Sequence, residues 1–118
     1  MNLDQSNSCR DAELLDLIRM GDSAAFREIY EKHWSVLLNM SYKRLDRIEI
    51  AEEVVQDIFV NLFLRRAELE VRTSLEAYLK TALKYKIFDV FRSMASHARC
   101  VDALVQQQHL TSLHLKAI

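Results

Sequence analysis

Carboxylate, amide and aliphatic side chains share one face of a helix predicted over residues 49–66. At 100° per residue, its other apolar side chains form one broad arc toward the core: Ala51, Val54, Val55, Ile58, Phe59, Leu62 and Phe63. The opposite arc holds Glu53, Gln56, Asp57, Val60 and Leu64. This composition is typical of a small protein-docking surface with a polar rim. The alternative, of equal weight from sequence alone, is that the first helix or the C-terminal tail covers Val60 and Leu64.

Cations alternate with aromatic rings on a helix predicted from Thr73 to about Ser96. Its expected buried stripe consists of Leu75, Leu79, Ala82, Leu83, Val90 and Met94. A second arc carries Lys80, Lys84, Tyr85, Phe88 and Arg92. Cations follow phosphates and rings stack on unpaired bases, so this arc suits single-stranded nucleic acid. From these residues alone, the stronger alternative packs the two rings against a neighbouring helix and leaves the cations solvated.

Motifs for catalysis or metal binding are absent from the sequence. The chain has one glycine, Gly21, which cannot form a glycine-rich phosphate loop. It has neither an HExxH motif nor the Glu-x-x-His pairs of a di-iron bundle. The histidines lack regular ligand spacing: His33, His97, His109 and His114. We therefore expect a non-enzyme without a metal or cofactor.

Composition favours one all-α domain in a reducing compartment. The chain has 118 residues, 50% of them hydrophobic, with no proline, and sheets with tight turns need more proline and glycine. Cys9 and Cys100 lie far apart and form no CxxC motif, which fits the cytoplasm. No signal peptide is recognisable, and no apolar stretch approaches about 20 residues, so we expect no membrane insertion.

The two halves of the chain differ in charge. Residues 1–57 hold 7 Lys/Arg and 12 Asp/Glu, whereas residues 58–118 hold 9 and 5. A polyanion is a candidate partner for the basic half. Ordinary surface charge explains the same asymmetry equally well.

Residues typical of helix starts and ends predict two helices in the N-terminal part of the chain. Asp11 is expected to cap a short first helix that ends at Gly21. A second helix starts at Asp22 or Ser23, presents apolar residues at helical spacing, and becomes basic at its end: Lys43, Arg44 and Arg47.

Residues 65–74 interrupt the helical pattern and are predicted to form a loop. Near the end of this segment, Thr73 is predicted to start the fourth helix and to form a capping box with Glu76. We expect a helical domain over residues 1–96, followed by a tail over residues 97–118. This tail could be a linker, a frayed helix or a truncated stub.

Three segments, in order and at the usual spacing, resemble region 2 of bacterial sigma factors of the extracytoplasmic-function group. They are GDSAAFREIYEKHWSVLLNMSYKRL, AEEVVQDIFVNLF and LEAYLKTALKYKIFDVFR. The resemblance covers about Ala12 to Ser93. It implies a compact bundle of about four helices that binds core RNA polymerase and recognises and melts the promoter −10 element. It also implies that an anti-sigma factor is a candidate partner.

The resemblance also implies roles for particular residues. Glu53, Gln56 and Asp57 fall on the motif that docks on the clamp helices of the largest polymerase subunit, with Val60 and Leu64 as the apolar centre of that contact. The loop from Ala67 to Ser74 matches the loop that holds a flipped base. The residues implied in contact with the non-template strand are Arg72, Ser74, Lys80, Lys84, Tyr85, Phe88 and Arg92.

The sequence departs from the family pattern in several places. Tyr78 and Phe63 replace tryptophans, and Tyr85 replaces an asparagine, which puts base specificity in doubt. No helix-turn-helix domain for the −35 element follows Ser96, so we expect a fragment or a protein that acts alone with weak promoter affinity. The rival hypotheses are an interaction-only helical adaptor or anti-sigma decoy that binds no DNA, and a helical metalloenzyme.

Overall fold

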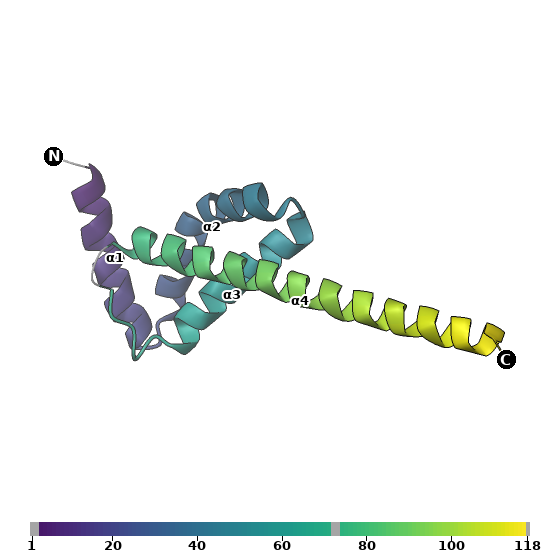
Figure 1. Cartoon of the computed structure of the whole chain (residues 1–118). Coiled ribbons are helices and arrows are strands. Elements are labelled where there is room, and N and C mark those ends of the chain that lie inside the picture. Colours follow the sequence, from purple (N-terminus) through teal and green to yellow (C-terminus); the bar gives the residue numbers. More distant parts are fainter. Residues whose placement is uncertain (1–2, 72–73, 118) are drawn as a thin grey trace. The chain divides into compact units, whose positions relative to one another are not determined.

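The computed structural model of the protein describes residues 3–71 and 74–117, with side chains over residues 9–71 and 74–107. The described residues form four helices and no strand, which confirms the all-α prediction: α1 (Leu3–Arg19), α2 (Ser23–Leu45), α3 (Ile48–Leu64) and α4 (Leu75–Ala117) (Figure 1). The chain divides into two compact units, Met1–Ile87 and Phe88–Ile118, and α4 contributes residues to both.

The turn between α1 and α2 depends on Gly21. Its φ of +87° is left-handed, a conformation that glycine adopts at little cost. The Gly21 N–H donates to the Ile18 carbonyl at 2.9 Å, and the Asp22 N–H donates to the Leu17 carbonyl at 3.1 Å. These two bonds form a Schellman motif, as expected for a helix that stops at glycine. Asp22 then caps α2, since its Oδ1 accepts from the Ala25 N–H at 3.1 Å.

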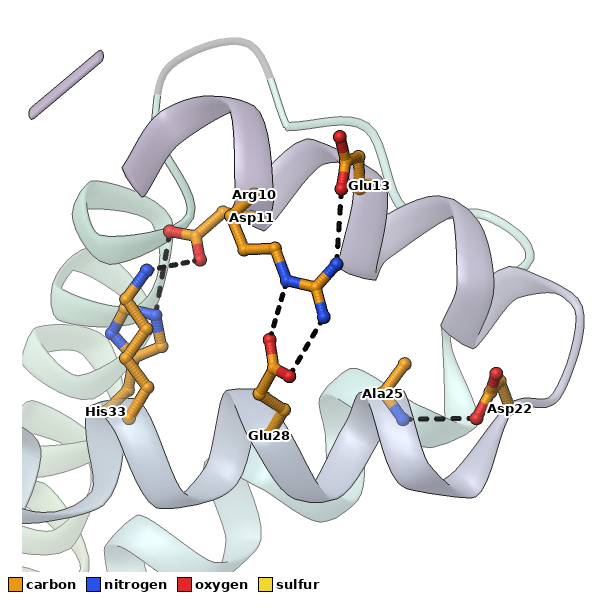
Figure 2. A network of polar contacts seen from close by, with 8 residues as sticks. Arg10, Asp11, Glu13, Asp22, Ala25, Glu28 and His33 are labelled. Carbon is orange, nitrogen blue, oxygen red and sulfur yellow. Dashed lines mark hydrogen bonds and ion pairs between the residues drawn. The ribbon is translucent and has the colours of Figure 1, made fainter. Parts of the chain in front are cut away.

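The prediction that Asp11 caps the first helix is wrong. The helix α1 begins at Leu3, so Asp11 lies in its interior, and its side chain is buried. The Asp11 carboxylate accepts from Lys32 Nζ at 2.8 Å and lies 3.7 Å from His33 Nε2 (Figure 2). A polar residue near the start of an apolar run indicates a cap in the sequence, but here it joins α1 to α2.

Arg10 makes a second polar connection between α1 and α2. Its guanidinium donates to both Glu28 oxygens at 2.9 Å and to Glu13 at 3.2 Å (Figure 2). The hydrogen bonds from Arg10 lower the pKa of Glu28, and those to the two glutamates raise the pKa of Arg10. These contacts join α1 to α2 at the surface, where solvent screens them, so they contribute little to stability.

His33 is the buried titratable group of this α1–α2 contact. Its Nε2 has no hydrogen-bond partner among the described residues. Burial lowers the pKa of His33 and outweighs the nearby Asp11 carboxylate, which raises it. Lys32 adds to the lowering and Glu76 opposes it. The folded protein therefore favours neutral His33 at pH 7.

Acidification from pH 7.5 to 5.5 is expected to lower the free energy of unfolding through His33. Unfolded His33 takes up its proton near its ordinary pKa of about 6.5, whereas folded His33 does so only at lower pH. The contribution of neutral His33 to the free energy of unfolding is fully present above pH ~6.5. Below that pH it is lost, by at most about 1.4 kcal/mol per pH unit. Urea unfolding at each pH measures this. His33→Gln should flatten the dependence of the free energy of unfolding on pH, and His97→Gln should not. If the dependence on pH is unchanged in His33→Gln, His33 is not its cause.

Aromatic rings fill the space between α2 and α3. The ring centroids of Tyr30 and Phe59 lie 4.9 Å apart, those of Tyr30 and Trp34 lie 5.0 Å apart, and those of Phe26 and Phe63 lie 5.2 Å apart. Phe59 is only 1% exposed. This cluster, together with the aliphatic face of α3, holds the two central helices together.

Ser74 caps α4, and its Oγ accepts from the Ala77 N–H at 3.0 Å. The predicted capping residue, Thr73, lies outside the described residues. The buried stripe of α4 is Leu75, Leu79, Leu83 and Ile87. The prediction was correct for the three leucines, missed Ile87, and was wrong for Met94, which is exposed. Within the unit Met1–Ile87 the buried stripe of α4 ends at Ile87, and every described side chain from Phe91 to Gln107 in the second unit is exposed.

The fourth helix is also longer than predicted. It continues past Ser96 to Ala117, so the segment expected to be a tail is helical over its described residues. Residues 97–117 contain no proline or glycine, so nothing in the backbone stops the helix at Ser96. A functional boundary between residues 96 and 97 stays a prediction.

Candidate functional site

The outer face of α3 consists of Glu53, Gln56, Asp57, Val60 and Leu64, at the positions predicted. Val60 is 52% exposed and Leu64 is 69% exposed within the unit Met1–Ile87, so the alternative that the first helix covers them is wrong. The alternative that the tail covers them concerns the other unit and stays open. Gln56, Val60 and Leu64 follow one another at intervals of four residues and line one side of the helix. The inner arc of α3 is buried as predicted, except that Phe63 is half-buried. The helix therefore presents an uncovered apolar strip with polar neighbours.

Asp57 is the least exposed member of this face and has a partner on α4. Its Oδ2 lies 3.5 Å from Lys86 Nζ, and both side chains remain partly exposed. Solvent screens such a pair, so it contributes little to stability. Sequence reasoning missed Lys86, because the pairing depends on how α3 and α4 pack.

The predicted nucleic-acid residues of α4 begin in the first unit with Lys80, Lys84 and Tyr85. Tyr85 is 69% exposed and Lys84 is exposed. Lys80 forms an ion pair with Glu76 at 3.0 Å, one helical turn earlier. This contact with Lys80 lowers the pKa of Glu76. Tyr85 is thus an exposed ring on the same helix as the two cations, and it is available to a ligand.

Phe88 and Arg92 belong to the second unit. Phe88 is 67% exposed, and Arg92 Nη2 donates to Asp89 Oδ1 at 2.6 Å. The alternative that Tyr85 packs against a neighbouring helix is wrong within the unit Met1–Ile87, where this ring is exposed. Further along α4, Phe91 and Met94 are exposed as well.

The loop between α3 and α4 is anchored from both sides. The carbonyl of Leu69 accepts from Arg19 Nη2 at 2.9 Å, and the Leu69 side chain is buried. Arg66 lies 4.3 Å from the centroid of the Phe63 ring and donates to the Phe63 carbonyl at 2.9 Å. A pocket of about 250 Å³ opens beside this loop, lined by Arg65, Glu68, Leu69, Glu70 and Tyr78.

Arg72 and Ser74 are the two residues before α4 that were predicted to contact DNA. Arg72 lies outside the described residues. Ser74 is half-buried, and its hydroxyl oxygen is already engaged as the cap of α4. Ser74 therefore has a structural role whether or not it also contacts a ligand.

A groove between α2 and α4 was not predicted from the sequence. Its rim carries Lys43 and Arg44 from α2 together with Lys80 and Lys84 from α4. The basic end of α2 was visible as a sequence feature. Only the packing of α2 beside α4 brings the four cations around one hollow.

The part of the chain that the structure describes offers no candidate metal site, disulfide or membrane-spanning helix. No group of three or more His, Cys, Asp or Glu residues there could hold a metal ion. Cys9 and Cys100 are free and exposed. None of the described helices combines the length and apolar character needed to cross a bilayer.

The fold and these exposed faces define a small all-α module whose notable surfaces lie on α3 and α4. The model of the family described as Sigma-70 region 2 matches residues 29–97, more than half of the chain. The chain therefore belongs to the sigma-70 family of sigma factors, as a region 2 domain, and has a role in transcription initiation. The region 2 family is a non-enzymatic class of transcription factor domain. No curated protein and no solved structure matches the chain.

Proposed function

We propose that this chain is region 2 of an extracytoplasmic-function sigma factor, active in the cytoplasm. In this proposal the outer face of α3 docks on the clamp helices of the largest RNA polymerase subunit. Val60 and Leu64 form the apolar centre, and Glu53, Gln56 and Asp57 form the polar rim. The observation that carries the proposal is the exposure of the two aliphatic side chains, since a solvated helix face would normally be polar.

The DNA part of the proposal rests on α4 and the preceding loop. Lys80 and Lys84 would contact phosphates of the non-template strand of the −10 element, and Tyr85 would stack on an unpaired base. Phe88 and Arg92 would extend this contact along the helix. The pocket beside the loop would receive a flipped base, whose unstacking costs a few kcal/mol.

A second candidate function is an interaction-only adaptor that an anti-sigma factor covers. It is favoured by the exposed apolar side chains of the second unit, among them Phe91, Met94, Val101 and Leu104. Such a protein would bind its partner tightly without binding DNA. The DNA measurement below separates the two functions.

Replacing Lys80 and Lys84 together by alanine is expected to weaken the salt dependence of DNA binding. Each phosphate contact contributes about 0.7 to the slope of log K against log salt for a single strand, so the slope should fall by about 1.4. Fluorescence anisotropy with a short −10 non-template oligonucleotide measures the slope. Arg27→Ala is the control, because this exposed arginine pairs with Glu31 on α2 and lies outside the proposed contact. No binding by wild type would favour the adaptor, and an unchanged slope would remove both lysines from the contact.

A further inference from the structure

The groove between α2 and α4 lies entirely within the unit Met1–Ile87 and has a volume of about 380 Å³. It is lined by Met40, Lys43, Arg44, Lys80, Thr81, Leu83, Lys84 and Ile87. Hollows of roughly 300–1,000 Å³ are the size that small organic groups occupy in proteins. The groove is therefore large enough for a nucleoside but too small for a helix of a partner protein.

The rim of the groove is strongly basic, although the chain as a whole has a net charge of −1. Four lining residues are cationic and none of the lining residues is acidic. Three of these cations are exposed and form no ion pair with the described residues: Lys43, Arg44 and Lys84. The fourth, Lys80, forms an ion pair with Glu76. Positive charge concentrated at one hollow attracts an anionic ligand.

The floor of the groove is apolar. Leu83 and Ile87 are buried side chains of α4, and Met40 of α2 is partly exposed. Methionine is polarisable and makes favourable contacts with aromatic rings. A cationic rim above an apolar floor suits a nucleotide, which combines charged phosphates with a flat base whose faces stack on apolar or polarisable groups.

The arrangement suits a strand better than a free phosphate or mononucleotide. The groove meets α2 at its last turn, where the exposed backbone groups are carbonyls and not the N–H donors that hold an isolated phosphate. The binding groups are long, separate cations on two helices, as in grooves that follow a nucleic-acid backbone. Two of them, Lys80 and Lys84, are already assigned to the strand in the proposed function.

We propose that this groove holds one nucleotide of single-stranded DNA, with the adjoining phosphates on Lys43 and Arg44. The strand that α4 holds would thereby cross onto the C-terminal end of α2. This inference rests on the proposed DNA binding by α4, and it adds α2 as a second element of the interface.

The test uses the full chain with Lys43→Gln and Arg44→Gln combined. Glutamine keeps helix propensity and removes charge. Because both cations also lie in the last turn of α2, where they favour the helix dipole, thermal unfolding of each variant checks the fold. We expect the salt slope for the −10 oligonucleotide to fall by about 1.4, as for two lost phosphate contacts. Arg27→Gln is the matched control and should leave the slope unchanged.

A second variant, Met40→Glu, tests the floor without removing a cation. Met40 is partly exposed, so the fold should tolerate glutamate, while a carboxylate in the groove should weaken oligonucleotide binding at least tenfold. Met40→Leu should bind as wild type does. Full binding by Met40→Glu would overturn the proposal.

The outcomes distinguish this inference from the proposed function. If Lys80→Ala/Lys84→Ala lowers the slope but Lys43→Gln/Arg44→Gln does not, the groove is not part of the interface and the role of α4 stands. If the wild-type chain binds no oligonucleotide, both proposals fail. A change of slope in Arg27→Gln that equals, per removed charge, the change in Lys43→Gln/Arg44→Gln would also overturn the groove assignment, because the loss would then be one of general charge.

Discussion

Replacing Phe59 by alanine is expected to lower the free energy of unfolding by about 3–5 kcal/mol, the usual cost of removing a buried aromatic ring. Phe59 is 1% exposed, and its ring contacts Tyr30 and also faces Trp34, with centroids 4.9 and 6.4 Å apart respectively. The truncation leaves a cavity between α2 and α3 that the stiff aromatic neighbours cannot close. Urea unfolding followed by circular dichroism measures the change.

The neighbouring residue Val60 provides the control for Phe59→Ala. It lies on the same helix but is 52% exposed, so Val60→Ala should change the free energy of unfolding by no more than about 0.5 kcal/mol. The loss in free energy of unfolding for Phe59→Leu should lie between those for Phe59→Ala and Val60→Ala, because leucine fills part of the cavity. A loss below about 1 kcal/mol for Phe59→Ala would contradict the role of this ring in joining the two helices.

The sequence was most informative about α3. Its inner arc, including Ala51, Val54 and Ile58, is buried as the 3.6-residue period predicts. Its outer arc could be drawn from the same period, but the period could not tell whether another helix covered it. The exposure of Val60 and Leu64 depends on how the helices pack, so it is known only from the three-dimensional structure.

The errors have identifiable physical causes. Asp11 has the residue type of a helix cap, but its role in the structure depends on Lys32 and His33, which lie on another helix. The length of α4 was underestimated because the apolar pattern weakens after Ile87, whereas helix propensity does not. Packing and propensity are separate influences on a helix.

The groove between α2 and α4 could not be predicted from the sequence, because local patterns do not show which helices lie side by side. Lys43 and Lys84 are 41 positions apart in the sequence, and no local pattern places them around one hollow. The basic end of α2 could be recognised from the sequence. Its pairing with α4 required the fold.

Replacing Val60 and Leu64 together by aspartate is expected to lower the affinity for core RNA polymerase by at least about a hundredfold. Each apolar side chain at the centre of an interface contributes about 1–3 kcal/mol, and each new carboxylate would be desolvated without a partner. Both side chains are exposed in the described structure, so the fold should tolerate the change. Competition binding with labelled wild-type protein measures the loss.

The polar rim needs its own control, because Asp57 also pairs with Lys86. If Asp57 contacts the polymerase directly, Gln56→Ala/Asp57→Ala should weaken binding and Lys86→Gln should not. If the ion pair itself were what matters, Lys86→Gln would weaken binding as much as Asp57→Ala does.

The most direct measurement is the affinity of the wild-type chain and of Val60→Asp/Leu64→Asp for the isolated clamp-helix fragment of the largest polymerase subunit, determined by calorimetry. The expected result is saturable binding by the wild type and at least about a hundredfold weaker binding by the variant, with thermal unfolding of the two proteins closely matched. Equal affinities, or no binding by the wild-type chain, would contradict docking through the outer face of α3.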